Sequence, residues 1–127
     1  MIFLITLFVI SCGKKEQNDL IGNWKLIESY WNDGGGNSGW TPRTDDITFT
    51  FKQNGTFSST SNFLSSGNMN CNGTYSFSDD DIISTSYICD TTHFERSYRF
   101  QFENGNLLLY PFPNYCDEGC ADKYVRR

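Results

Sequence analysis

Alternating hydrophobic and polar residues predict that several short segments of the chain are β-strands. In residues 94–103 four aromatic residues share one face with Arg96, while the other face is polar or charged throughout. Successive side chains of a strand point to opposite faces of a sheet, so this pattern predicts a strand with one buried and one solvated side. Ile47, Phe49 and Phe51 repeat the pattern. A helical spacing of hydrophobic residues is hard to find in this chain.

Turn-forming residues separate these segments. Asn54 and Gly55 predict one hairpin turn, and Asn104 and Gly105 predict a second of type I′, because asparagine and glycine tolerate the positive φ angles that such turns require. Three aspartates at residues 79–81 mark a further turn. The eight predicted strands are residues 24–31, 47–51, 56–61, 73–78, 82–89, 94–103, 106–110 and 123–127.

Eight short antiparallel strands in succession predict an all-β fold. The two candidate architectures are a small up-and-down antiparallel β-barrel and a two-sheet β-sandwich. The barrel is favoured because a closed sheet leaves no exposed edge, and a last strand paired with the first would bring the two ends of the domain together.

A hydrophobic run at residues 2–10, followed by Ser11 and Cys12, opens the chain. A membrane-spanning helix takes about 20 residues, whereas the hydrophobic region of a secretory signal takes roughly 7 to 15. Residues 9–12 resemble the bacterial lipobox, in which the cysteine receives a lipid. We therefore expect a lipoprotein signal peptide at residues 1–11, cleaved before a lipidated Cys12. The alternative is that the run forms a buried first strand.

The segment after this cysteine is charged and rich in amides. Residues 12–19 hold too little hydrophobic surface to offset the entropy of ordering, so we expect a flexible tether. Residues 20–127 suffice for one domain. Attached acyl chains would hold it on a membrane. Gly13 resembles an outer-membrane sorting signal, so the expected location is the bacterial cell envelope, at the periplasmic or the surface face of the outer membrane.

Charge and catalytic motifs narrow the possible functions. Fifteen acidic and ten basic side chains give a net charge of −5, which disfavours nucleic acid as a partner. The single histidine, His93, lies near Asp90 but is interpreted as a turn residue, and no nucleophile or phosphate-binding motif is present. The aspartates at residues 79–81 lack the spacing of a calcium loop. The expectation is a monomer that is not an enzyme and has no cofactor or metal.

Four cysteines remain after Cys12, which suits disulfide formation in an oxidising compartment. If residues 73–78 and 82–89 pair around the aspartate turn, Cys71 lies directly opposite Cys89, within disulfide distance. We therefore predict this bond, together with a second between Cys116 and Cys120. An exchange of partners between the two pairs remains open.

Several segments together resemble the lipocalin-like domain of bacterial lipoproteins. Residues 20–26 resemble the opening of the first strand, where Gly22 and Trp24 form a Gly-x-Trp motif. Residues 54–57, 73–75, 104–107 and 116–124 resemble later parts of the same domain. The resemblance implies a calyx-shaped barrel in which Trp24 closes one end and Arg126 or Arg127 stacks over its indole ring.

Such a barrel predicts a binding function. The leading hypothesis is a membrane-anchored protein that binds a small hydrophobic ligand inside the barrel, beneath a glycine-rich loop at residues 34–39. The alternative is a protein-binding or structural envelope module whose interior is filled by its own side chains, with Trp31, Trp40 and Tyr115 as exposed anchors. The residues predicted to line the interior are Trp24, Leu26, Phe49, Phe51, Phe57, Tyr75, Phe77, Tyr98, Phe100, Phe102, Leu107 and Leu109.

Overall fold

The computed structural model describes residues 12–32, 38–63, 68–113 and 119–127. These parts of the chain form one helix and nine strands, and the strands belong to a single antiparallel sheet. The elements are α1 (Cys12–Asp19), β1 (Gly22–Asn32), β2 (Ser38–Pro42), β3 (Thr48–Phe51), β4 (Thr56–Ser59), β5 (Cys71–Asp79), β6 (Ile82–Cys89), β7 (Thr92–Glu103), β8 (Asn106–Pro111) and β9 (Cys120–Arg126).

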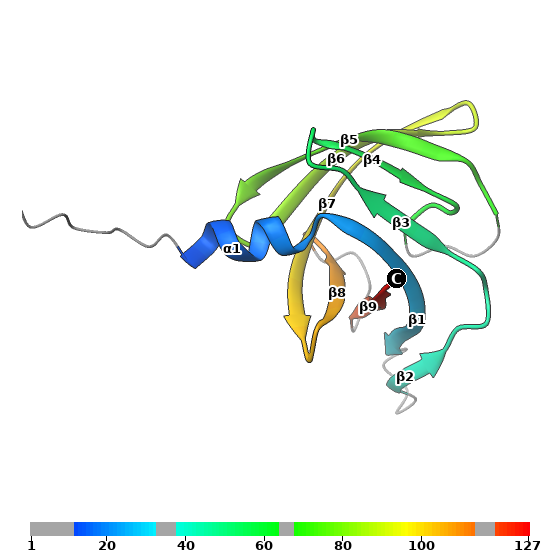
Figure 1. Cartoon of the computed structure of the whole chain (residues 1–127). Coiled ribbons are helices and arrows are strands. Elements are labelled where there is room, and N and C mark those ends of the chain that lie inside the picture. The colour runs from blue at the N-terminus through cyan, green and yellow to red at the C-terminus, as the bar shows by residue number, and fades with distance from the viewer. Residues whose placement is uncertain (1–11, 33–37, 64–67, 114–118) are drawn as a thin grey trace, which may run out of the picture.

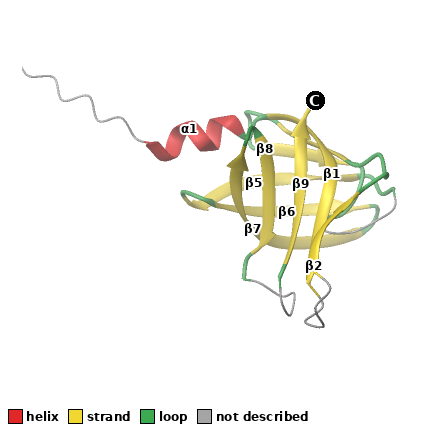
Figure 2. Cartoon of the chain, turned by 90° about the horizontal axis from the view of Figure 1, so that it is seen from below, coloured by secondary structure: helices red, strands yellow, loops and turns green. Residues whose placement is uncertain are grey.

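Strand β1 closes the sheet into a barrel because both of its edges are paired. One edge pairs with β9. The other edge pairs with β3 through residues 22–25 and with β2 through residues 28–32. Strands β2 and β3 therefore share one position beside β1, and the result is a closed eight-stranded antiparallel barrel. The curved wall is visible in Figures 1 and 2.

The two ends of the barrel differ. At one end, which we call the closed end, Leu20 and Trp24 are fully buried. Helix α1 and the C-terminus lie at this end (Figure 2). At the opposite end, which we call the mouth, β1 finishes at Asn32, β6 at Cys89 and β8 at Pro111.

The predicted all-β barrel is confirmed, and the sandwich alternative is not what forms. The buried positions follow the alternation of the sequence; in β3, for example, Phe49 and Phe51 are buried between half-exposed threonines. Each fully buried side chain of this size contributes roughly 1.5–3 kcal/mol of hydrophobic stabilisation. The core is therefore the interior of the barrel.

Two predicted turns have different geometry. Asn104 and Gly105 both adopt positive φ angles, 53° and 80°, as predicted for a type I′ turn. In the other turn only Gly55 has a positive φ, of 83°. That loop is longer, because the amide of Lys52 bonds to the carbonyl of Thr56 and the amide of Gly55 bonds to the carbonyl of Lys52.

Strand β2 was not predicted from the sequence. Residues 34–39 were expected to form a loop, yet Ser38 and Gly39 already belong to this strand. Glycine and proline lower the strand propensity of the segment. The strand forms because β1 is longer than β3 and offers residues 28–32 as a free edge for pairing.

Residues 12–19 also differ from the expected unstructured tether, because they form α1. Lysine, glutamate and glutamine favour helices, and the amide of Leu20 bonds to the carbonyl of Gln17 where the helix ends. The predicted signal peptide, residues 1–11, lies outside the described residues. Among the residues that are described, no helix has the length and hydrophobicity needed to cross a membrane.

Candidate functional site

The predicted interior residues do face the inside of the barrel. Most are buried, and three others, Tyr75, Phe77 and Phe102, are partly buried and pack against the same core. Their rings form a continuous network; Phe51 and Tyr75, for example, meet edge to face with centroids 5.2 Å apart. The fully or nearly fully buried members are Trp24, Leu26, Phe49, Phe51, Phe57, Tyr98, Phe100, Leu107 and Leu109.

Three buried rings of the core, those of Phe63, Tyr87 and Tyr124, were not among the predicted interior residues, and Phe63 differs from the other two in lying outside the strands. The centroid of the Phe63 ring lies 4.4 Å from that of Phe49 and 4.3 Å from that of Tyr98, and only 8% of the residue is exposed. Phe63 follows β4 in an irregular segment and does not belong to a strand. Strand alternation therefore gives no signal for it, and only its hydrophobic character among Ser61, Asn62 and other polar residues points to burial.

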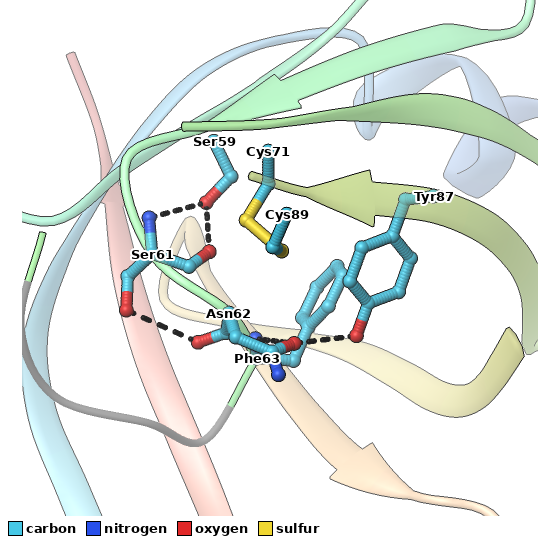
Figure 3. The surroundings of a disulfide bond; sticks show 7 residues. All are labelled: Ser59, Ser61, Asn62, Phe63, Cys71, Tyr87 and Cys89. Atoms are coloured by element: carbon cyan, nitrogen blue, oxygen red, sulfur yellow. Dashed lines mark hydrogen bonds between the residues drawn. A yellow bond between two sulfur atoms is a disulfide. The ribbon is translucent and has the colours of Figure 1, made fainter. Parts of the chain in front are cut away.

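Short-range hydrogen bonds hold this segment in place, as Figure 3 shows. The hydroxyl of Ser59 donates to the carbonyl of Ser61 and accepts from the amide of Ser61. The side-chain oxygen of Asn62 accepts from the amide of Phe63 at 2.9 Å and from the hydroxyl of Tyr87. The ring of Phe63 thus rests inside the barrel on a segment tied to β4 and β6.

The disulfide between Cys71 and Cys89 lies beside this segment (Figure 3). It joins β5 to β6 at the mouth, and the two residues are directly paired in the sheet, so the predicted bond is confirmed. Cys120 is also disulfide-bonded. Cys116, the partner predicted for it, lies outside the described residues.

A polar cluster occupies the mouth half of the interior. Asp122 is buried and accepts hydrogen bonds from the hydroxyl of Ser29 at 2.6 Å and from the hydroxyl of Tyr124 at 3.3 Å. The guanidinium of Arg43 donates to the oxygen of Ser29 at 2.9 Å and pairs with Asp45 at 2.8 Å. The ring of Tyr124 also touches Phe49, so this cluster adjoins the rings around Phe63.

The electrostatics of this cluster follow from burial and pairing. Burial raises the pKa of the Tyr124 hydroxyl well above its ordinary value, and the neighbouring Asp122 carboxylate raises it further. The hydrogen bond to Asp45 raises the pKa of Arg43, and the same bond lowers the pKa of Asp45. Among the described residues of this cluster, two carboxylates stand beside one guanidinium, so the cluster is formally negative when all three groups are ionised.

Trp24 and Arg126 close the opposite end. The Cζ atom of Arg126 lies 4.3 Å from the centroid of the Trp24 indole, and the indole nitrogen donates to the carbonyl of Leu20 at 2.8 Å. Of the two arginines proposed for this contact, Arg126 makes it. Gly22 has a φ of 136°, and a Cβ there would come within 2.6 Å of the Arg126 guanidinium. Glycine is therefore required at this point.

The other predicted residues lie outside the buried core of the barrel. His93 is exposed in β7 and its Nε2 atom lies 3.0 Å from the Ser86 hydroxyl, so it belongs to a strand and not to the expected turn. Trp31 is 61% exposed. The ring of Trp40 packs against that of Tyr30 on β1 with an angle of 57° between the ring planes, and Tyr115 lies outside the described residues.

Neither a metal centre nor a known relative identifies the site. The described residues contain no group of three or more histidine, cysteine, aspartate or glutamate side chains arranged to hold a metal ion. A scan against protein-family models, and searches of curated proteins and of solved structures, found no match. The interior and the outer surface of the barrel are therefore the features that bear on function.

Proposed function

We propose that this chain is a lipid-anchored, lipocalin-like binding protein of the bacterial cell envelope. Its barrel takes up a small hydrophobic ligand in the place that Phe63 occupies, and the protein does no chemistry on it. The observation that carries this proposal is the position of the Phe63 ring, which lies inside the barrel but is attached to an irregular segment of the chain.

A ring on such a segment can leave the interior without breaking the barrel wall. The wall is held by backbone pairing of its strands, whereas the segment of Phe63 is held by a few hydrogen bonds of Ser59, Ser61 and Asn62 and by the contacts of the phenyl ring with its neighbours. A ligand of similar shape would contact Phe49 and Tyr98 as the phenyl ring does. Burial of its apolar surface would offset the cost of displacing the ring.

The polar cluster favours a particular kind of ligand. Arg43, Ser29 and Asp122 are hydrogen-bonded to one another beside the aromatic interior, and a few polar groups placed in this way fix the orientation of a ligand in many small-molecule sites. Because the two carboxylates outnumber the guanidinium, an acidic ligand would be repelled. We therefore expect a mostly apolar molecule with a neutral or basic polar group.

The arrangement of the chain suits a tethered binding protein. Cys12, the predicted lipid attachment residue, begins α1. Figures 1 and 2 place α1 at the closed end. A lipid on Cys12 would therefore leave the mouth directed away from the membrane, accessible to a ligand in the aqueous phase.

Binding is tested with the neutral fluorescent probe N-phenyl-1-naphthylamine and protein carrying Cys12→Ser, which removes the lipid. Phe63→Ala should bind the probe at least about tenfold more tightly than the parent, because the competing ring is gone. Ile88→Ala, which truncates a 50% exposed hydrophobic side chain outside the barrel, is the matched control. Circular dichroism verifies that each variant is folded. A folded Phe63→Ala variant that takes up no probe would exclude the interior as a binding site.

Anchoring is tested separately by metabolic labelling of the full chain with radioactive palmitate in a bacterial host. The wild-type chain should carry the label and partition into detergent, and Cys12→Ser should do neither. An unlabelled wild-type chain would disprove the lipid anchor without bearing on ligand binding.

A second function, binding of a partner protein, is favoured by Trp31. This residue is 61% exposed at the mouth end of β1, and exposed tryptophans are frequent anchors of protein interfaces. In that case the filled interior would only stabilise the fold and would bind no ligand. Failure of probe binding in folded Phe63→Ala, together with a partner complex that Trp31→Ala abolishes, would favour this function.

A further inference from the structure

Aromatic side chains gather on one part of the outer surface. In β1 and β2 the rings of Tyr30 and Trp40 pack together, with centroids 5.6 Å apart. In the sheet Tyr30 is also paired with Ala121 of β9, whose side chain is a single methyl group. Beyond β9, Tyr110 of β8 pairs with Arg99 of β7. Tyr30 of β1 and Tyr110 of β8 both line one cleft on this surface.

A cleft of about 520 Å³ lies in this region. The rings of Tyr30, Tyr110 and Phe112 contribute to its walls, together with Pro111 and Pro113. Its size falls within the range of small-molecule sites in proteins. Aromatic walls offer flat apolar faces with a partial negative charge, against which the C–H groups of a ring can pack.

The polar groups of the cleft are a guanidinium, an amide and a phenol, all of which form hydrogen bonds. Arg99 and Gln101 line it together with Tyr110, and the amide nitrogen of Gln101 lies 3.4 Å from the Tyr110 hydroxyl. Guanidinium, amide and phenol groups supply several hydrogen-bond donors and acceptors within a short distance. An entirely apolar occupant would remove water from the donors and acceptors that these groups do not use on their protein partners, and this loss would weaken its binding.

Charge argues against an acidic occupant. Arg99 pairs with Asp81 at 3.4 Å, and its Cζ atom lies 5.2 Å from the Phe112 ring centroid. Its positive charge is therefore largely compensated within the protein, and the chain as a whole carries a net charge of −5. A neutral ligand suits the cleft better than an anion.

A neighbouring cleft on the other side of Phe112 and Pro113 provides a contrast. Its volume is about 550 Å³, but hydroxyl side chains predominate in its walls, including Ser76, Ser84 and Ser97. Phe112 is the one aromatic residue among the described residues that line it. Aromatic faces and hydrogen-bonding groups are thus combined in the cleft beside Tyr110.

We propose that the cleft lined by Tyr30, Tyr110, Phe112, Arg99 and Gln101 binds a neutral saccharide. Sugar rings carry apolar C–H faces that stack on aromatic side chains, and their hydroxyl groups exchange hydrogen bonds with guanidinium, amide and phenol groups. This site lies outside the barrel and is independent of ligand binding in the interior.

Isothermal titration of the full chain, purified with Cys12→Ser, with maltohexaose, cellohexaose and chitohexaose tests this proposal. At least one of these should bind, and Tyr110→Ala and Phe112→Ala should each weaken it about tenfold, as expected for the loss of a stacking ring. Ile88→Ala, which truncates a 50% exposed side chain of β6, should bind as the parent does.

The site is disproved if none of the three oligosaccharides binds at millimolar concentration. It is also disproved if folded Tyr110→Ala and Phe112→Ala bind as tightly as the parent, or if Ile88→Ala weakens binding equally. Probe uptake by Phe63→Ala should be unchanged by a saturating oligosaccharide, because the two sites are separate; competition between them would contradict an outer site.

Discussion

The guanidinium of Arg126 lies over the indole ring of Trp24, 4.3 Å from its centroid, and joins the last strand of the barrel to the first. The same guanidinium donates to the carbonyl of Ile21 at 2.9 Å and to that of Asp19. One side chain thus covers the closed end and fixes the approach of α1 to β1.

Arg126→Ala should lower the free energy of unfolding by about 1–2 kcal/mol, because the cation–ring contact and the hydrogen bonds to the carbonyls are lost. Urea denaturation followed by tryptophan fluorescence measures the effect. Arg127→Ala is the matched control, since this arginine is exposed and its guanidinium forms a long ion pair of 3.9 Å with the exposed Asp46. Equal effects of the two substitutions would contradict the stated role of Arg126.

Removal of the Cys71–Cys89 bond should destabilise the barrel. The bond links residues separated by 18 positions, and closing a loop of this length lowers the entropy of the unfolded chain by an amount worth about 3 kcal/mol. We expect the Cys71→Ala/Cys89→Ala double variant to melt at a clearly lower temperature than the parent under oxidising conditions. An unchanged melting temperature would contradict a stabilising role.

Tyr124 should make the protein sensitive to alkaline pH. Its pKa is raised in the folded state, chiefly by burial, so folding favours the protonated hydroxyl. The associated stability is complete below the pKa of tyrosine in the unfolded chain, about 10, and falls as pH rises from there towards the folded-state pKa. Urea denaturation at pH 8 and at pH 11 should show a smaller loss of stability for Tyr124→Phe than for the parent; an equal loss would refute this assignment.

Gly73 is required by the close approach of β5 and β6. A Cβ at this position would overlap the backbone carbonyl of Ser86 and the Cα and Cβ atoms of Tyr87. Gly73→Ala should therefore cost about 1–3 kcal/mol of stability, measured by thermal or urea denaturation. Asn72→Ala, at the adjacent exposed position, should stay within about 0.5 kcal/mol of the parent. A neutral Gly73→Ala would show that the two strands can separate locally.

Strand alternation and turn chemistry predict most of the barrel, because both are local properties of the chain. The alternation of Phe100 and Phe102 with polar residues predicts β7, and Asn104 with Gly105 predicts the turn after it. The pairing of Cys71 with Cys89 follows from the register of a single hairpin. Each of these features can be predicted from segments that are neighbours in the sequence.

The parts that were not predicted depend on contacts between distant segments. Strand β2 forms because β1 leaves an edge unpaired by β3, which the composition of residues 38–42 does not reveal. Phe63 enters the interior from outside the strand pattern. The polar cluster joins Ser29 to Asp122, which lie 93 positions apart, and so requires the closed barrel to be known first.

The meeting of the two ends has a practical consequence for labelling. The amide of Arg127 bonds to the carbonyl of Asn23 at 2.9 Å, so the C-terminal residue lies beside the start of β1. A fluorescent reporter fused after Arg127 would sit on the same side as α1, where it would leave the mouth unobstructed. Circular permutants that join these ends and open the chain at the exposed Asn104–Gly105 turn should likewise retain the barrel.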